Sequence, residues 1–212
     1  MKRLLVLSLA LLLLLCSCSR GHKFQRTEAG NGYIDQKTDL TYTMLDISFE
    51  AAVQGEAVGT FTDKKRDITV IFHEIPSLEP TLFLADEDRN VYYAGEGVLD
   101  PAAWRIEAAL VCEGDGTAIV ERSRFTAEAN APTVEKIRDL WFEGEEANFL
   151  SLKAADKMYS IKLVSKDHPN LYYCFSFLAF DEGESYFYHA VSHRSVVVPA
   201  DLVKQLRASE VA

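Results

Sequence analysis

Two histidines four residues apart have a spacing that could hold a metal ion. His189 and His193 stand in the segment YFYHAVSHRSVVV, and on a helix this spacing would place both on one face. The segment is aromatic and β-branched, which predicts a strand instead, and four residues of strand span about 13 Å. Each ligand of a zinc ion lies roughly 2 Å from the metal. The sequence therefore predicts no shared zinc site at these histidines.

The acidic loop DEDRN at residues 86–90 places oxygen ligands at every second position, as a calcium loop does. An EF-hand loop has glycine at its sixth position and a bidentate glutamate at its twelfth. Here those positions hold Val91 and Gly97. A charged hairpin loop explains the pattern better, and the sequence predicts neither a metal nor a cofactor.

Motifs for covalent or phosphate chemistry are missing from the sequence. It contains no G-x-S-x-G elbow and no glycine-rich phosphate loop. The SKDH run at residues 165–168 has a serine, an aspartate and a histidine, but neighbours on one turn cannot form a catalytic triad. A glycosidase-type pair of acids needs no fixed spacing. A hydrolase with a dispersed active site therefore stays as the alternative, and we assign no catalytic residue.

The N-terminal residues carry a more specific chemical signal. Lys2 and Arg3 precede an apolar run from Leu4 to Leu15 that only Ser8 interrupts. A run of about a dozen residues is too short to span a membrane, which takes roughly 20. It fits the apolar region of a secretory signal peptide, which lies behind a basic head.

The end of this run resembles the lipobox of bacterial lipoproteins. Leu15 stands at position −3, the small residue Ser17 at −1 and Cys18 at +1. The resemblance implies that Cys18 becomes the first mature residue and carries a diacylglycerol, with an acyl chain on its new amino group. Cys16 fits poorly, because the bulky Leu15 would then stand at −1, and it would leave with the signal peptide at residues 1–17.

The resemblance to lipoproteins covers residues 1–19 only, and residues 33–212 resemble no family that we recognise. One acyl chain holds a protein on a membrane only marginally, whereas two hold it stably. The implied location is the extracytoplasmic face of a bacterial membrane. Ser19 is not the aspartate that signals inner-membrane retention in many enteric-type bacteria, and the sequence does not say whether that membrane is an inner or an outer one.

The composition is that of a globular protein with an acidic balance. Of 212 residues, 48% are hydrophobic and 25% charged. The formal net charge is −10, and loss of the two basic residues in the signal peptide makes it −12. Such a charge argues against a nucleic-acid partner, whose binding depends on neutralising phosphates with lysine and arginine.

The elements that would position any site are mainly short strands. Residues 18–32 are polar and without periodicity, which predicts a flexible tether, and residues 33–212 are expected to form a single globular domain. Its predicted class is α+β, with mostly antiparallel strands and about two amphipathic helices. The expected strands and helices lie at 39–47, 68–75, 81–95 (a hairpin), 104–112, 117–125, 131–144 (a helix), 148–191 (a meander) and 199–207 (a helix).

The densest apolar stretch is LYYCFSFLAF, residues 171–180. It has apolar residues on both faces, which favours a central buried strand. On that interpretation Phe175 and Phe177 are buried on one face, and Cys174 and Leu178 on the other. An exposed aromatic platform for sugars or peptides is the alternative.

Two cysteines, Cys112 and Cys174, would remain as thiols in the mature chain. An extracytoplasmic location permits a disulfide, but both lie in apolar strands, where free cysteine is commonly buried. We expect two separate buried thiols, with a disulfide as the alternative. The function that we expect is a membrane-anchored, non-catalytic binding module for an envelope protein, peptide or glycan.

Overall fold

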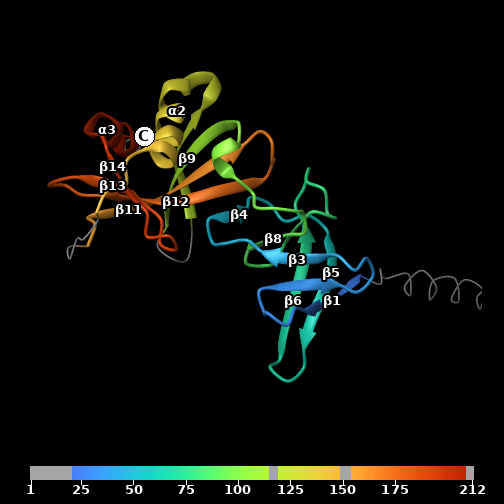
Figure 1. Cartoon of the computed structure of the whole chain (residues 1–212). Helices are drawn as coiled ribbons and strands as arrows, with labels where there is room; N and C mark the ends of the chain where they lie inside the picture. Colours follow the sequence, from blue (N-terminus) through green and yellow to red (C-terminus); the bar gives the residue numbers. More distant parts are fainter. Residues whose placement is uncertain (1–20, 115–118, 149–153, 209–212) are drawn as a thin grey trace, which may run out of the picture.

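The strands of this protein divide between a closed barrel and a larger sheet with helices on one face (Figure 1). The structure is a computed structural model, and it describes residues 21–114, 119–148 and 154–208. It is β-rich with mostly antiparallel pairing, which confirms the predicted α+β class. Cys18 lies outside the described residues.

Seven strands form the barrel in the order β1-β2-β3-β8-β7-β6-β5. The barrel closes where β1 pairs in parallel with β5, with His22 opposite Gly59. A Cβ atom at Gly59 would lie 2.1 Å from the carbonyl oxygen of His22, so only glycine permits this closure. The strands are β1 (His22–Arg26), β2 (Gly32–Asp35), β3 (Thr41–Met44), β5 (Ala57–Asp63), β6 (Ile68–Glu74), β7 (Phe83–Ala85) and β8 (Val91–Tyr93).

Aromatic side chains fill the barrel. The ring of Phe72 is completely buried and its centroid lies 4.4 Å from that of Phe24, 4.9 Å from that of Tyr33 and 5.3 Å from that of Tyr92. Contacts at these separations are the tilted and edge-to-face arrangements that aromatic rings favour. The barrel interior is thus a packed core.

The barrel corrects one sequence-based prediction. Residues 18–32 were expected to be a tether, but β1 occupies His22–Arg26 and β2 begins at Gly32. Only Phe24 is buried in β1, so the strand has no alternating apolar pattern that the sequence could reveal. Pairing with β2 on one edge and β5 on the other stabilises it instead.

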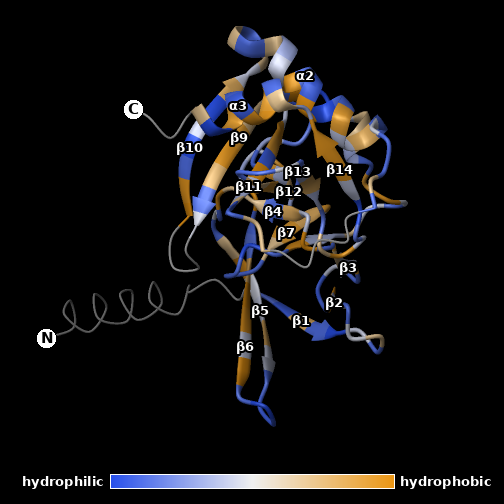
Figure 2. Cartoon of the chain, turned by 90° about the vertical axis from the view of Figure 1, so that its left-hand side faces the viewer, coloured by the Kyte–Doolittle hydropathy of each residue, from blue (hydrophilic) through white to orange (hydrophobic). Residues whose placement is uncertain are grey.

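The second sheet follows the order β10-β9-β11-β12-β13-β14. Helices α2 (Ala127–Glu143) and α3 (Ala200–Ala208) cover one of its faces, and hydrophobic residues line the strands beneath them (Figure 2). Its strands are β9 (Ile106–Gly114), β10 (Ile119–Thr126), β11 (Lys157–Ser165), β12 (Leu171–Ala179), β13 (Ser185–Tyr188) and β14 (Ser195–Val198).

The helices begin and end close to their predicted positions. Thr126 caps α2 by accepting a hydrogen bond from the backbone N–H of Ala129, and a non-helical Asn130 kinks the helix before Pro132. The expected helix at 131–144 corresponds to the part after this kink. In α3, Leu202 and Leu206 are buried against the sheet, as its amphipathic pattern predicts. No helix among the described residues is long and apolar enough to cross a membrane.

A short strand joins the two sheets. β4 (Phe49–Ala51) follows the first three barrel strands, yet it pairs with β12, with Phe49 opposite Tyr173. Phe49 and Ala51 share an apolar cluster with the barrel residue Phe83 and with Trp104, which follows the short 3-10 helix η1 (Pro101–Ala103). The sequence predicts one domain over 33–212, and the structure gives this region two sheets joined by a common apolar cluster.

Candidate functional site

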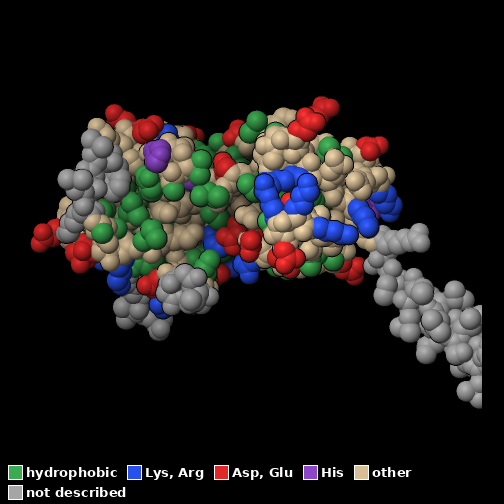
Figure 3. Space-filling view, turned by 90° about the horizontal axis from the view of Figure 1, so that it is seen from below, with side chains coloured by type: hydrophobic (Ala, Val, Ile, Leu, Met, Phe, Trp, Pro, Cys, Tyr) green, Lys and Arg blue, Asp and Glu red, His purple; other side chains and the backbone are tan. Residues whose placement is uncertain are grey.

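No described helix covers the face of the second sheet opposite α2 and α3, and we call it the open face. Alternation along β11 sends Ile161 and Leu163 into the helix-covered core, so Ser160, Lys162 and Val164 face the other way. Figure 3 views the molecule from below, and hydrophobic side chains gather over its left half, where this sheet lies. The open face therefore holds a smaller buried cluster, Ala108, Leu110, Cys112 and Val164, beside the exposed Met158.

Glu50 of β4 is the centre of charge at the edge of this face. Its carboxylate accepts a hydrogen bond from Lys162 Nζ at 2.6 Å and from Arg89 Nη1 at 3.3 Å. The Lys162 side chain is only 5% exposed, and its ammonium lies 5.6 Å from the ring centroid of Tyr172. A buried lysine requires such an anionic partner, so Glu50 both neutralises Lys162 and ties β4 to β11.

Two depressions flank Glu50. One, of about 480 Å³, lies toward the barrel loop that carries Arg89 and is also lined by Ile119. The other, of about 210 Å³, runs along β12 and β13 past Ser176. Ile47 and Glu50 line both depressions. We call the two together the junction groove.

Exposed aliphatic side chains surround the junction groove. Ile47 is 64% exposed and Ile119 61%, and both line the groove. Met158, on the same face of β11, is 64% exposed. Large apolar side chains gathered at a groove are typical of surfaces that bind a partner. This arrangement offers a shallow apolar rim around a neutralised carboxylate.

A buried serine and histidine lie beside the groove. Ser48 Oγ lies 2.5 Å from His189 Nε2, and His189 Nδ1 lies 2.8 Å from Ser192 Oγ. Burial lowers the pKa of His189, and the nearby Asp46 carboxylate opposes this shift. A Ser–His contact is what a nucleophile needs, but Ser48 is only 1% exposed and the third partner is a hydroxyl. The pair links the segment before β4 to the turn after β13.

The two histidines at the predicted strand lie in a turn. β13 ends at Tyr188 and β14 begins at Ser195, so the expected continuous strand across His189 and His193 is wrong. The two rings have different partners. His193 Nδ1 lies 3.1 Å from the Tyr188 hydroxyl, whereas His189 contacts Ser48 and Ser192. A positive φ of 56° at His193 makes the turn, which strand propensity did not reveal.

The acidic loop forms the turn of the expected hairpin between β7 and β8. Asp86 accepts hydrogen bonds from the backbone N–H groups of Asp88 and Asn90, from the Asn90 amide and from the Tyr92 hydroxyl. Its oxygens thus hold the loop together. Within the described ranges, no three His, Cys, Asp or Glu side chains are grouped to hold a metal ion.

The SKDH run also forms a turn, between β11 and β12. Ser165 Oγ accepts hydrogen bonds from the backbone N–H groups of Asp167 and His168. Asp167 is paired with Arg105, and the His168 ring contacts Trp104. Burial lowers the pKa of His168, and Asp167 opposes this shift. The three side chains serve the turn and the apolar cluster.

The aromatic stretch is the core strand that the sequence favours. Phe175, Phe177 and Leu178 are 4%, 0% and 8% exposed, while Cys174 is half-buried on the open face. The phenylalanines pack beneath the helices, with Phe175 stacked on Trp141 at a centroid distance of 4.3 Å. An exposed aromatic platform at these positions is therefore wrong.

Both remaining cysteines are free thiols, as expected. β11 lies between the strands that carry Cys112 and Cys174, so their Cα atoms are two strand spacings apart, about 10 Å. A disulfide takes Cα atoms within about 7 Å. Burial raises the pKa of both thiols, which disfavours the reactive thiolate.

Sequence reasoning missed Glu50, Lys162 and Ser48. Lys162 left a trace, because it is the one charged residue inside the apolar run YSIKLV. Glu50 and Ser48 left none, since their partners are more than 100 residues away along the chain. Comparisons of this chain with family models, curated proteins and solved structures find no match.

Proposed function

We propose that this protein is an extracytoplasmic lipoprotein, anchored at Cys18, that binds an envelope partner in the junction groove without catalysing a reaction. The observation that carries the binding proposal is the exposed aliphatic rim, Ile47 and Ile119, beside the ion-paired Glu50. Aliphatic side chains around a neutralised polar centre suit a polypeptide. A glycan would favour exposed aromatic rings, and the aromatic rings that line the groove are buried, at Phe49 and Phe175, or half-buried, at Tyr188.

The anchor proposal rests on the LCSC segment and its apolar run. Replacing Cys18 by alanine is expected to abolish incorporation of a fatty-acid probe, because the acylated thiol is gone. Cys16→Ala is the matched control and should leave labelling unchanged. Continued labelling of the Cys18→Ala protein would refute the anchor.

A photo-crosslinking residue in the groove tests the binding proposal. Placed at Ile47 or Ile119 in cells, it is expected to give one discrete adduct with an envelope polypeptide. The matched control is Val98, which is 94% exposed and lines neither depression. Equal adducts at Val98 and at the groove positions would contradict a specific site.

A hydrolase is the second candidate because of the Ser48–His189 contact. We expect no reaction of Ser48 with a fluorophosphonate probe, since its hydroxyl is buried. Ser48→Ala serves as the control. Labelling of the native chain that disappears in Ser48→Ala would favour the hydrolase over the binding module.

A further inference from the structure

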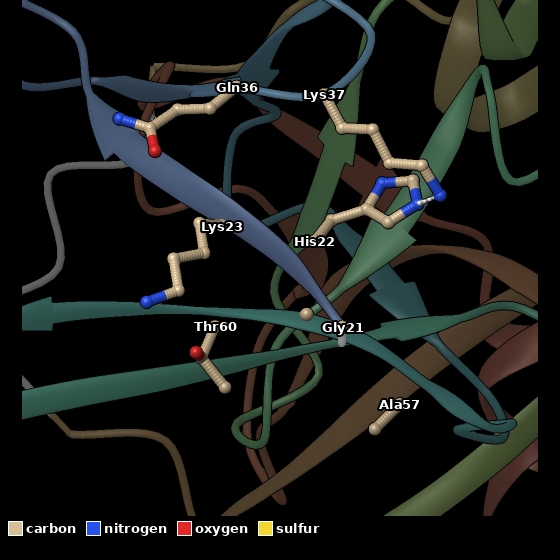
Figure 4. Close-up of a pocket in the computed structure, with 8 residues that line it drawn as sticks. Gly21, His22, Lys23, Gln36, Lys37, Ala57 and Thr60 are labelled. Atoms are coloured by element: carbon tan, nitrogen blue, oxygen red, sulfur yellow. Dashed lines mark hydrogen bonds between the residues drawn. The ribbon is translucent and has the colours of Figure 1, made fainter. Parts of the chain in front are cut away.

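A depression of the barrel lies beside the first residues of β1. About 750 Å³ in volume, it is lined at β1 by Gly21, His22 and Lys23 and across from them by Lys37 and Thr60. Figure 4 shows Lys23 and Lys37 on opposite sides of β1, with the ammonium of Lys37 against the His22 ring. We call this surface the β1 rim.

The β1 rim is basic on an acidic barrel. Residues 21–94 contain 7 Lys and Arg against 13 Asp and Glu, yet no carboxylate lines the rim. Both lysines are exposed, and no ion pair joins Lys23 to another described residue. The rim therefore presents two cations that no carboxylate neutralises.

Buried Asp35 orients the rim. Its carboxylate accepts hydrogen bonds from His22 Nδ1 at 2.6 Å, from the backbone N–H of Lys37 at 2.9 Å and from Thr38 Oγ1 at 2.7 Å. Because the ring proton is on Nδ1, Nε2 of His22 can accept a hydrogen bond from Lys37 Nζ, 3.1 Å away. The hydrogen bonds of the Asp35 carboxylate thus go to these three groups and not to the ammonium groups of Lys23 or Lys37.

The position of the rim along the chain points to its partner. His22 stands four positions after Cys18, a separation that spans at most about 14 Å. An acylated Cys18 would therefore hold the β1 rim close to lipid headgroups, while the barrel lies between this end and the second sheet (Figure 1). Lysines on both sides of β1 suit a surface that carries many phosphates.

We propose that the β1 rim is the membrane-facing surface of the protein and that Lys23 and Lys37 bind the phosphate groups of anionic lipids. This inference rests on the proposed anchor at Cys18. Each lysine near an anionic membrane surface contributes about 1 kcal/mol, so two favour the docked orientation by roughly tenfold or more. Docking at the rim would place the second sheet on the far side of the barrel from the lipid (Figure 1).

A reporter cysteine tests the orientation. The acylated chain carrying Thr60→Cys is placed in vesicles of phosphatidylglycerol and phosphatidylcholine, or of phosphatidylcholine alone. Reaction of the introduced thiol with a bulky, water-soluble maleimide is then followed by mass spectrometry, which separates it from Cys112 and Cys174. We expect labelling about tenfold slower in the anionic vesicles.

Charge variants locate the effect. Lys23→Glu together with Lys37→Glu should remove the protection, whereas Lys64→Glu with Lys65→Glu, in the β5–β6 turn of the same barrel, should retain it. Equal labelling in both vesicle types, with the protein still vesicle-bound, would overturn the proposal and leave the anchor intact. Equal loss in both charge variants would overturn the assignment to the β1 rim. Release from the vesicles would refute the anchor and this inference with it.

Discussion

The barrel and the second sheet bury their strands in different ways. The strands of the barrel close around a core that contains Phe24, Phe72 and Tyr92. Only the outer surface and the two ends of the barrel are therefore exposed to solvent. The second sheet buries one face beneath α2 and α3, while the other face has no described helix over it and buries only a smaller cluster around Leu110 and Val164. The two proposed binding surfaces follow this difference, since the β1 rim lies at the end of the barrel and the junction groove lies at the edge of the sheet.

The largest expected effect comes from emptying either core. Phe177→Ala in the sheet and Phe72→Ala in the barrel each remove a completely buried ring and should cost about 3–5 kcal/mol of unfolding free energy. Because the cluster around Phe49 and Trp104 joins the two regions, each variant is expected to unfold in one transition.

Urea unfolding followed by tryptophan fluorescence measures this coupling, since Trp141 reports on the sheet core and Trp104 on the common cluster. Two separated transitions in either variant would show that the barrel and the sheet unfold independently. Val98→Ala, at an exposed position, controls for truncation itself and should change stability by less than about 0.5 kcal/mol.

A smaller effect is expected from Glu50→Gln, which leaves Lys162 without its anion. Breaking a buried ion pair is strongly destabilising, but Glu50 is 22% exposed, so we expect about 2 kcal/mol. Lys162→Met in the same chain should recover most of the loss. The exposed Arg105–Asp167 pair is the control, and Asp167→Asn should cost much less because solvent screens this pair. No recovery in the double variant would contradict this account.

The smallest effect is on pH dependence, and it separates the two regions. Burial lowers the pKa of His189 and His168 below the ordinary value of 6.5, so the unfolded chain binds protons first as the pH falls. Unfolding free energy is therefore complete above about pH 6.5 and declines as the pH falls toward the folded-state pKa values. His168→Gln with His189→Gln should flatten this decline, and an unchanged profile would contradict it.

Asp35 gives the barrel a more acidic window. Burial raises its pKa, but hydrogen bonds from Lys37, Thr38 and His22 outweigh this and hold the pKa below 3.8. Its contribution to stability is present above pH 3.8 and is lost as the pH falls through the lowered pKa. Asp35→Asn should weaken the decline below pH 3.8, measured by thermal unfolding, and leave the histidine window unchanged.

Local patterns predicted the second sheet better than the barrel. The apolar run at 171–180 and the amphipathic helices bury a face in the helix-covered core, and the alternation at 104–112 buries Ala108, Leu110 and Cys112 on the opposite face, so their periodicity is visible in the sequence. β1 buries Phe24 alone and depends on pairing with Gly59 in β5. A strand held by distant neighbours leaves little local trace.

The candidate site follows the same division. Lys162 stands out within an apolar strand, whereas Glu50 and Ser48 gain their meaning only when β4 pairs with β12. The turn at His189 was missed for the opposite reason. Its aromatic and β-branched neighbours predicted a strand. The positive φ of the turn lies at His193, and histidine is not one of the residue types that usually mark a turn.

The closure of the barrel at Gly59 has a mechanical consequence. Tension between an anchor at Cys18 and a partner in the junction groove would enter the fold at His22, along the axis of β1. β5 pairs with the first residues of this strand and β2 with the rest, so extraction must shear both ladders rather than peel one bond at a time. The parallel pairing that a glycine permits would thus hold β1 in the barrel under such a pull.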